Sequence, residues 1–258
     1  ANKLMGTQLD DDTMIIGTSG RYEFKNKGIN VYLEALNRLT RDKNLKKDVL
    51  AFINVPGWVG EVREDLRERL DSGKDYDTPL ECPFITHWLH NMSHDQVLDM
   101  LKYLNMSNSV DTKVKVVFVP CYLDGKDGIL NELYYDLLIG TDLSVYPSYY
   151  EPWGYTPLES IAFKVPTITT DLAGFGLWVN SLTGKNATLQ DGVKVIHRTD
   201  YNYSEVADTI KDTISEFSSL TSTEINKIRK NAANIAEKAL WKHFIQYYYE
   251  AYDIALRN

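Results

Sequence analysis

Short apolar runs alternate with segments of helical periodicity along most of the chain. Four runs bounded by turn residues predict buried strands, at residues 13–18, 49–55, 113–120 and 193–196. Apolar residues at helical spacing predict helices at 58–72, 94–104, 130–139, 203–218, 222–239 and 241–256, and one whose face carries Ile29, Leu33, Leu36 and Leu39. A strand, a short helix and another strand are predicted within 145–176. Strands that alternate with helices are typical of the α/β class.

This alternation predicts one Rossmann-like domain over residues 1–258. We expect a doubly wound parallel sheet of about six strands, covered by helices on both faces. The composition fits such a sheet, because 43% of the 258 residues are hydrophobic and 12% are aromatic, which can fill a substantial core. No internal repeat or low-complexity tract interrupts the sequence.

Residues 145–176 concentrate turn residues and polar side chains around one helix start. After a buried strand comes a Pro/Gly-rich turn, then the short helix, the second strand and a loop bracketed by glycines at 174–176. Thr156 is a favourable N-cap, Pro157 suits the first helical position, and Glu159 stands where a capping box needs a carboxylate. The sequence therefore predicts a helix that begins at this threonine.

An anion such as a diphosphate is the natural ligand of this helix start. The unpaired N–H groups around Tyr155 and Thr156, together with the helix dipole, favour negative charge. Gly154 lets a ligand approach the backbone closely. Glu151 and Glu159, separated by seven residues, flank the site and can accept hydrogen bonds from sugar hydroxyls.

A second polar cluster lies in the loop at 19–28, after the first predicted strand. It contains Arg21 and Lys27, which are six residues apart, so both can reach the same phosphate. Ligands of doubly wound sheets bind at the carboxyl ends of the strands, where this loop begins. In the alternative interpretation Arg21 pairs with Glu23 and Lys27 is merely solvated.

Two sequence words carry a specific resemblance. Tyr-Tyr-Glu-Pro-Trp-Gly-Tyr-Thr-Pro at 149–157 and Ile-Thr-Thr-Asp-Leu-Ala-Gly-Phe-Gly at 168–176 closely resemble the glycogen synthase family of the animal and fungal type. These proteins are retaining glycosyltransferases of the two-domain GT-B architecture. The resemblance implies that the chain is the C-terminal, nucleotide-sugar-binding half of such an enzyme, without its N-terminal acceptor domain. The implied reaction transfers glucose from UDP-glucose to an α-1,4-glucan with retention of configuration.

The resemblance also assigns roles to single residues. Arg21 and Lys27 are expected to hold the donor diphosphate, and Glu151 is expected to hold hydroxyls of the donor sugar; these three form the catalytic set. Glu159 is expected at the nucleotide ribose, with the capping box as an alternative, and Tyr134 against the uracil base. The remaining donor-binding positions are Gly154, Tyr155 and Thr156. A preference for UDP over ADP is left open, as is a lesser role for Tyr122 at the base.

Composition excludes several classes of partner. The net charge of −8 argues against nucleic acid and against an anionic membrane surface. No run of 18 apolar residues and no signal peptide are recognisable, so we expect a soluble, cytoplasmic protein. Cys82 and Cys121 are the only cysteines, too few for a disulfide framework or a Cys-rich zinc site.

No metal or other cofactor is expected. Asp75 and Asp77 have the Asp-x-Asp spacing of another glycosyltransferase architecture, but no apolar strand precedes them. His87 and His90, at helical spacing, have no third ligand at a sensible distance in the sequence, so packed or hydrogen-bonded histidines are the simpler interpretation.

Other functions remain as alternatives. One is a retaining GT-B transferase with a different acceptor, and another is a non-catalytic nucleotide- or glycan-binding module. By itself the chain is expected to be inactive, and self-association of the full-length enzyme is left open. The aromatic stripe at 241–256 either faces the absent domain or is a buried core helix. The family's arginine-rich regulatory helix is reduced here to Lys227, Arg229 and Lys230, which predicts weak or absent activation by a sugar phosphate.

Overall fold

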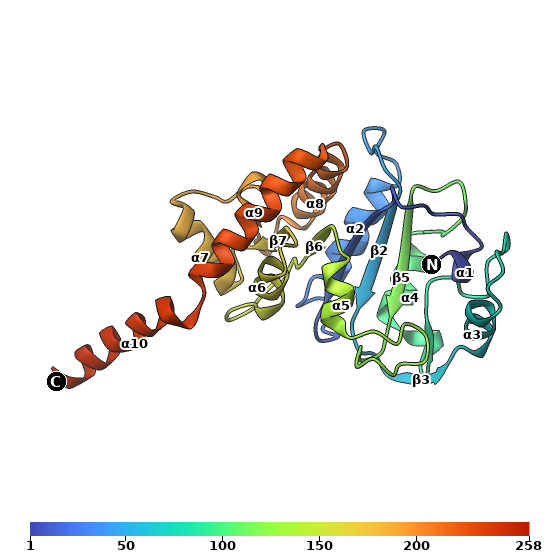
Figure 1. The fold of residues 1–258 in the computed structure, drawn as a ribbon, viewed down its shortest axis with the longest axis horizontal. Coiled ribbons are helices and arrows are strands. Elements are labelled where there is room, and N and C mark those ends of the chain that lie inside the picture. The colour runs from blue at the N-terminus through green and yellow to red at the C-terminus, as the bar shows by residue number, and fades with distance from the viewer. Residues whose placement is uncertain (258) are drawn as a thin grey trace.

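The computed structural model describes residues 1–257, and its centre is one sheet of six parallel strands in the order β5-β2-β1-β6-β7-β8 (Figure 1). These strands span Met14–Ser19 (β1), Val49–Asn54 (β2), Val114–Val119 (β5), Leu143–Val145 (β6), Thr167–Thr170 (β7) and Val193–Ile196 (β8). Two further strands, Val59–Val62 (β3) and His87–Leu89 (β4), pair in antiparallel fashion as a separate small sheet. The predicted doubly wound α/β fold is confirmed.

Helices cover both faces of the large sheet (Figure 1). They span Asn2–Met5 (α1), Ile29–Leu39 (α2), Glu64–Asp71 (α3), Gln96–Tyr103 (α4), Tyr134–Ile139 (α5), Tyr155–Ala162 (α6), Gly174–Thr183 (α7), Tyr203–Ser218 (α8), Ser222–Lys238 (α9) and Trp241–Leu256 (α10), with 3-10 turns at Met92–His94 (η1) and Leu189–Asp191 (η2). Within residues 1–257, no helix combines the length and the apolar character that a bilayer crossing requires.

Apolar side chains on both faces of the strands build the core. Ile16 of β1 and Val116 of β5 belong to the cluster under α2, α4 and α8, whereas Leu50 and Val117 belong to the cluster under α1 and α3. Parallel strands buried on both faces read as mostly apolar runs, which is why the sequence pattern located β1, β2, β5 and β8. Strand β6 is a correction, because it ends at Val145, where the predicted strand begins.

The sheet changes direction between β1 and β6. From β1 the chain winds outward through β2 and β5, and from β6 it winds the other way through β7 and β8. The chain therefore leaves β1 and β6 in opposite directions along the sheet, and doubly wound sheets bind ligands in the crevice at such a switch point. The two sequence clusters predicted to bind an anion begin at these two strand ends.

Two predicted helices differ from the observed elements. Residues 58–72 were predicted as one helix, but β3 occupies the first part and α3 starts only at Glu64. Pairing with β4, a tertiary contact, overrides the local helical pattern there. The helix predicted from residue 130 starts at Tyr134, because the Asp127 carboxylate accepts hydrogen bonds from the N–H groups of the three residues at 129–131 and holds them in a loop.

The glycine-bracketed segment at 174–176 is also a correction, because it forms the first turn of α7 and not a loop. Both glycines are needed for close approach of neighbouring backbone. A Cβ on Gly174 would lie 2.2 Å from the carbonyl oxygen of Pro152, and one on Gly176 would lie 2.1 Å from that of Thr170. The first turn of α7 can thus pack directly against the loop that carries Glu151.

Helix α10 leads away from the body of the molecule (Figure 1). None of its residues is buried, and its aromatic side chains are largely exposed, among them Trp241, Tyr248 and Tyr252. Phe244 is an anchor at its start, with its ring centroid 5.5 Å from that of Trp178. The alternative of a fully buried core helix is wrong, and the aromatic stripe is solvent-exposed in this chain.

Candidate functional site

A cavity of about 520 Å³ lies at the carboxyl ends of the central strands, beside the crevice between β1 and β6. Its lining includes Ser19, Arg21, Tyr22, Tyr122, Tyr134 and Thr156. These residues come from the β1–α2 loop, the segment after β5, and the starts of α5 and α6. Three of the predicted site residues therefore share one cavity, although they are far apart in the sequence.

The β1–α2 loop is held against the β6–α6 loop by a tight backbone contact. Gly28, the N-cap of α2, has φ 71°, and a Cβ there would lie 2.0 Å from the carbonyl oxygen of Pro147. Arg198, which is 5% exposed, donates a hydrogen bond from its guanidinium to this same carbonyl. Only glycine fits such an approach, so the loop geometry fixes the position of the neighbouring Lys27.

Lys27 forms an ion pair with Glu151, and both side chains are mostly buried, at 14% and 15% exposed. The Glu151 backbone is fixed as well, because its N–H donates to Leu172 and its carbonyl accepts from Gly174. The structure thus brings two of the three predicted catalytic residues into contact. The alternative of a merely solvated Lys27 is wrong.

Arg21 lies apart from this ion pair. Its side chain is 74% exposed and bonds Glu23 at 2.8 Å, which is the partner considered as an alternative from the sequence. It also lines the cavity, so an anion there has an unburied guanidinium within its reach. The position of Arg21 is thus compatible both with the pair to Glu23 and with binding of an anion in the cavity.

The start of α6 differs from the prediction. Gly154, with φ 116°, is the N-cap, no side chain caps the helix, and Tyr155 is the first helical residue. Thr156 is therefore not the cap, and Pro157 is the third helical residue and not the first. A left-handed glycine turns the chain into the helix earlier than the threonine signal indicated. The exposed N-terminal N–H groups and Thr156 remain beside the crevice as expected.

Glu159 takes no part in a capping box, which corrects that alternative. Its carboxylate accepts a hydrogen bond from the hydroxyl of Tyr135 at 3.2 Å. Burial raises the pKa of this carboxyl above its usual value, and the Tyr135 hydrogen bond opposes that shift in part. Because Glu159 does not cap the helix, the start of α6 does not explain why a carboxylate stands at this position.

Tyr134 is fixed by a chain of hydroxyl groups that sequence reasoning did not find. Its hydroxyl lies 2.6 Å from Ser19 Oγ, which lies 3.3 Å from the hydroxyl of Tyr146. The chain continues to Ser160 at 2.9 Å and from there to Ser144 at 3.1 Å. Burial raises the pKa of Tyr134, so its hydroxyl stays protonated. Scattered serines and tyrosines carry no periodic signal that would have revealed this network.

Tyr22 is a second residue that the sequence did not single out. Its hydroxyl donates to Asp95 Oδ2 at 2.7 Å and accepts from the N–H of Val97 at 3.1 Å. Its ring packs edge-on against Phe118, with centroids 5.8 Å apart. Tyr22 thereby anchors the loop that carries the adjacent Arg21 to the start of α4.

The candidate metal ligands are distributed differently from the sequence expectation. His87 and His90 lie on and just after strand β4, not on a helix, and His87 is buried and hydrogen-bonded as predicted. Asp75 forms an exposed ion pair with Lys3 at 3.2 Å. The structure also supplies His87 with neighbours that the sequence did not reveal, since Cys121 and Asp127 converge on it.

Comparison with known proteins supports the fold and identifies the family. The solved structure of a glycosyltransferase from Rickettsia africae superposes on 96% of this chain and 49% of its own length, with a TM-score of 0.51 and 18% identity. This likeness supports the fold, which is one half of the GT-B architecture. Glycogen [starch] synthase isoform 2 of Saccharomyces cerevisiae is 27% identical over 96% of this chain, and its Neurospora crassa and Caenorhabditis elegans counterparts are equally similar.

The chain spans less than half the length of these curated relatives, between 42% and 44%. A family model described as glycogen synthase matches residues 72–258, which include the β6–α6 loop and the whole second half of the sheet. By this match the chain belongs to the glycogen synthase family.

Proposed function

We propose that this chain is the donor-binding half of a glycogen synthase. It binds a nucleotide sugar, UDP-glucose, and together with an N-terminal acceptor half transfers glucose to an α-1,4-glucan with retention of configuration. Membership of the family supports the reaction class. The observation that carries the site assignment is the contact of Lys27 with Glu151 beside the free N-terminus of α6.

The proposed chemistry follows from where charge develops. As the bond between glucose and the distal phosphate breaks, negative charge builds on that phosphate and the sugar becomes oxocarbenium-like. Lys27, Arg21 and the N–H groups at Tyr155 and Thr156 stabilise the leaving diphosphate. These groups supply the positive charge, so the reaction needs no metal at the donor phosphates.

The remaining assignments concern orientation of the donor. Glu151 accepts hydrogen bonds from the glucose hydroxyls, and its ion pair with Lys27 fixes the carboxylate next to the phosphate site. Glu159 receives the ribose hydroxyls, and Tyr134 offers its ring to the uracil.

The acceptor and the cellular setting are part of the same proposal. The glucan binds through the acceptor half, so the chain alone binds donor and does not transfer glucose, and the full enzyme acts in the cytoplasm, where it can form homo-oligomers. A different acceptor for the same donor site is the alternative.

Calorimetric titration of the chain with UDP, ADP and their glucose conjugates tests the donor assignment. We expect UDP compounds to bind, and Lys27→Ala to weaken binding strongly, whereas the control Lys25→Ala, in the same loop but exposed, should bind like the parent chain. No binding of any of these compounds, or equal effects of the two variants, would refute the proposal.

A further inference from the structure

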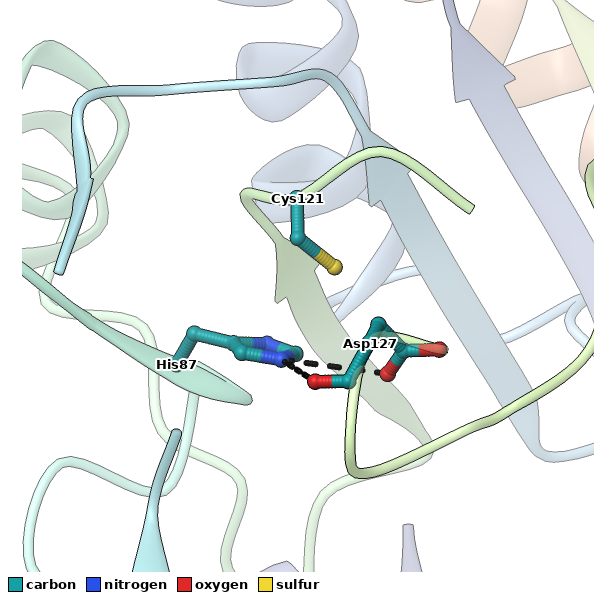
Figure 2. A group of neighbouring side chains, drawn as sticks. All are labelled: His87, Cys121 and Asp127. Atoms are coloured by element: carbon teal, nitrogen blue, oxygen red, sulfur yellow. Dashed lines mark hydrogen bonds and ion pairs between the residues drawn. The ribbon is translucent and has the colours of Figure 1, made fainter. Parts of the chain in front are cut away.

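Three potential metal ligands of different chemistry meet in the interior, away from the Lys27–Glu151 pair. They are the imidazole of His87, the thiol of Cys121 and the carboxylate of Asp127, whose ligand atoms all lie within 4.8 Å of one another. Figure 2 shows the three side chains turned toward a common space. They come from β4, from the end of β5 and from the loop before α5, so only the tertiary fold unites them.

All three groups are withdrawn from water. The side chains of His87 and Asp127 are 3% and 0% exposed, and Cys121 is 9% exposed at the edge of the cavity. A buried carboxylate is costly unless it is compensated. The compensation here is uneven, because Asp127 has three backbone N–H donors but its nearest cationic candidate, His87 Nε2, lies 3.8 Å from Oδ1.

We infer that His87, Cys121 and Asp127 form a binding site for one Zn²⁺ ion. One nitrogen, one sulfur and one oxygen ligand suit Zn²⁺, whereas a thiolate disfavours the hard cations Mg²⁺ and Ca²⁺. The divalent charge is balanced by one thiolate and one carboxylate, so the buried assembly is neutral. Three protein ligands leave a fourth position for water, which the adjoining cavity at Cys121 can supply.

Neighbouring groups can hold the ligands as a metal site requires once the tautomer of His87 changes. His87 Nδ1 lies 2.9 Å from the hydroxyl of Thr86, which reaches the carbonyl of Phe118 at 3.4 Å. In the tautomer that donates from Nδ1 to Thr86, the Nε2 lone pair is free for the ion. Metal-binding histidines usually make such a bond from the other ring nitrogen. The N–H donors at 129–131 fix Asp127 in the same way.

Binding of Zn²⁺ at this site requires two small rearrangements and the release of one proton. His87 Nε2 now lies 2.8 Å from the carbonyl oxygen of Asp127, to which it donates a hydrogen bond. When Zn²⁺ binds, the ring proton must move from Nε2 to Nδ1, and this hydrogen bond is lost. Zinc bonds of about 2.0–2.1 Å to nitrogen and oxygen require a separation of roughly 3.3 Å between those ligand atoms. The observed 3.8 Å between Nε2 and Oδ1 must therefore contract slightly. The thiol proton of Cys121 leaves, and Zn–N, Zn–S and Zn–O bonds form.

The ion would brace a segment that borders the cavity. Cys121 and Asp127 enclose residues 122–126, and Tyr122, Leu123 and Asp124 are part of the cavity lining. The carbonyl of Leu123 also accepts a hydrogen bond from the N–H of Tyr134. The proposed role of the ion is thus structural. Testing it requires neither a bound donor nor transferase activity, so the result does not depend on the proposed function.

Titration of the reduced chain with Co²⁺, followed by displacement with Zn²⁺, tests the site. We expect one Co²⁺ per chain with a thiolate-to-cobalt charge-transfer band, and loss of that band in Cys121→Ser and in His87→Gln. The matched control Cys82→Ser changes the exposed cysteine and should keep the band. Absence of the band in the parent chain, or its survival in Cys121→Ser, would overturn the proposal.

Proton release gives a second measurement on the unaltered chain, which remains valid should a variant fail to fold. Cys121 can bind Zn²⁺ only as its thiolate, so a bound ion must expel the thiol proton. Calorimetry in buffers of different ionisation enthalpy should give one proton released per Zn²⁺, and affinity should fall about tenfold per pH unit decrease. Binding without proton release would mean that the thiol is not a ligand.

Discussion

The ammonium group of Lys27 and the carboxylate of Glu151 meet across 124 residues of sequence, in a contact largely shielded from solvent. Each group lies on a loop that leaves a central strand at the point where the sheet reverses its order. The pair has a double consequence for the proposed site. It holds a carboxylate where sugar hydroxyls are expected, and it holds a cation at the edge of the phosphate position.

Removal of either cation should slow transfer in an enzyme completed by its acceptor half. We expect Arg21→Ala and Lys27→Ala each to reduce turnover by about 10² to 10³, roughly 3 to 4 kcal/mol, the usual effect of losing one preorganised donor to a developing charge. Initial rates with saturating UDP-glucose measure the loss. Lys25→Ala is the control, and near-normal turnover in both variants would rule out the leaving-group role.

Glu159→Gln should separate ligand binding from fold stability. Because burial raises the pKa of Glu159, its ionised form at neutral pH costs folding free energy, and glutamine removes that cost while it still accepts the Tyr135 hydrogen bond. Urea titrations should therefore show unchanged or slightly higher stability, whereas calorimetry should show weaker UDP binding. A variant with normal UDP affinity would eliminate the ribose role.

Two substitutions at Tyr134 distinguish its ring from its hydroxyl. Tyr134→Phe removes the 2.6 Å contact with Ser19 but keeps the ring, so UDP should bind with only modestly reduced affinity. Tyr134→Ala removes the ring and should cost about 1 to 3 kcal/mol of base stacking. Titration of both variants with UDP and with inorganic diphosphate provides the control, because diphosphate has no base. Equal losses for the two ligands would argue against stacking.

The exposed pair of His197 and Asp171 should make stability depend on pH. Their 2.6 Å hydrogen bond raises the pKa of His197 above its ordinary 6.5, so the folded chain binds this proton more tightly than the unfolded chain. The stabilisation is complete below pH 6.5 and disappears as pH rises through the raised pKa. Unfolding of the parent and of His197→Gln should differ at about pH 5.5 and converge by about pH 9. A difference independent of pH would contradict this assignment.

Activation by glucose 6-phosphate should be weak or absent in the full-length enzyme. Arg229, one of the three cations in the candidate sensing segment at 227–230 of α9, pairs with Asp142 at 2.9 Å. The second oxygen of Asp142 accepts the N–H of Ile15, so the arginine ties α9 to the central sheet. Transfer rates measured over a titration with glucose 6-phosphate test this prediction. Strong activation would contradict it, and would show that Lys227 and Lys230 are enough to bind the sugar phosphate.

Sequence reasoning located β1, β2, β5 and β8 because burial on both faces makes these strands mostly apolar; in β5 every residue is buried and only Lys115 is charged. It also located α8, α9 and α10 to within one residue, since the helical periodicity of each extends over many residues. It failed where distant contacts decide local structure. Strand β3 pairs with β4, which is distant in sequence. A local signal also misled the prediction for α6, which starts at Tyr155 because the left-handed Gly154 is its N-cap.

The candidate site was predictable in part for a similar reason. Lys27 and Glu151 stand in recognisable words that begin at strand ends, so their meeting could be expected from the topology of the sheet. The hydroxyl chain behind Tyr134 and the guanidinium of Arg198 have no such signal. They are single polar residues, and only the packed structure shows which carbonyl or hydroxyl each one meets.

The central position of β1 has a consequence for how this chain folds. Its edge facing β6 remains unpaired until residue 142 and its neighbours are available, and the contact of Ile15 with Asp142 spans 127 residues. During synthesis on the ribosome, the first half of the sheet would therefore expose the unpaired N–H and C=O groups of β1 until β6 is made. A partly formed sheet with such an edge tends to associate with other chains. Closure of that edge and assembly of the Lys27–Glu151 pair are then late events, and refolding yield should fall steeply with protein concentration.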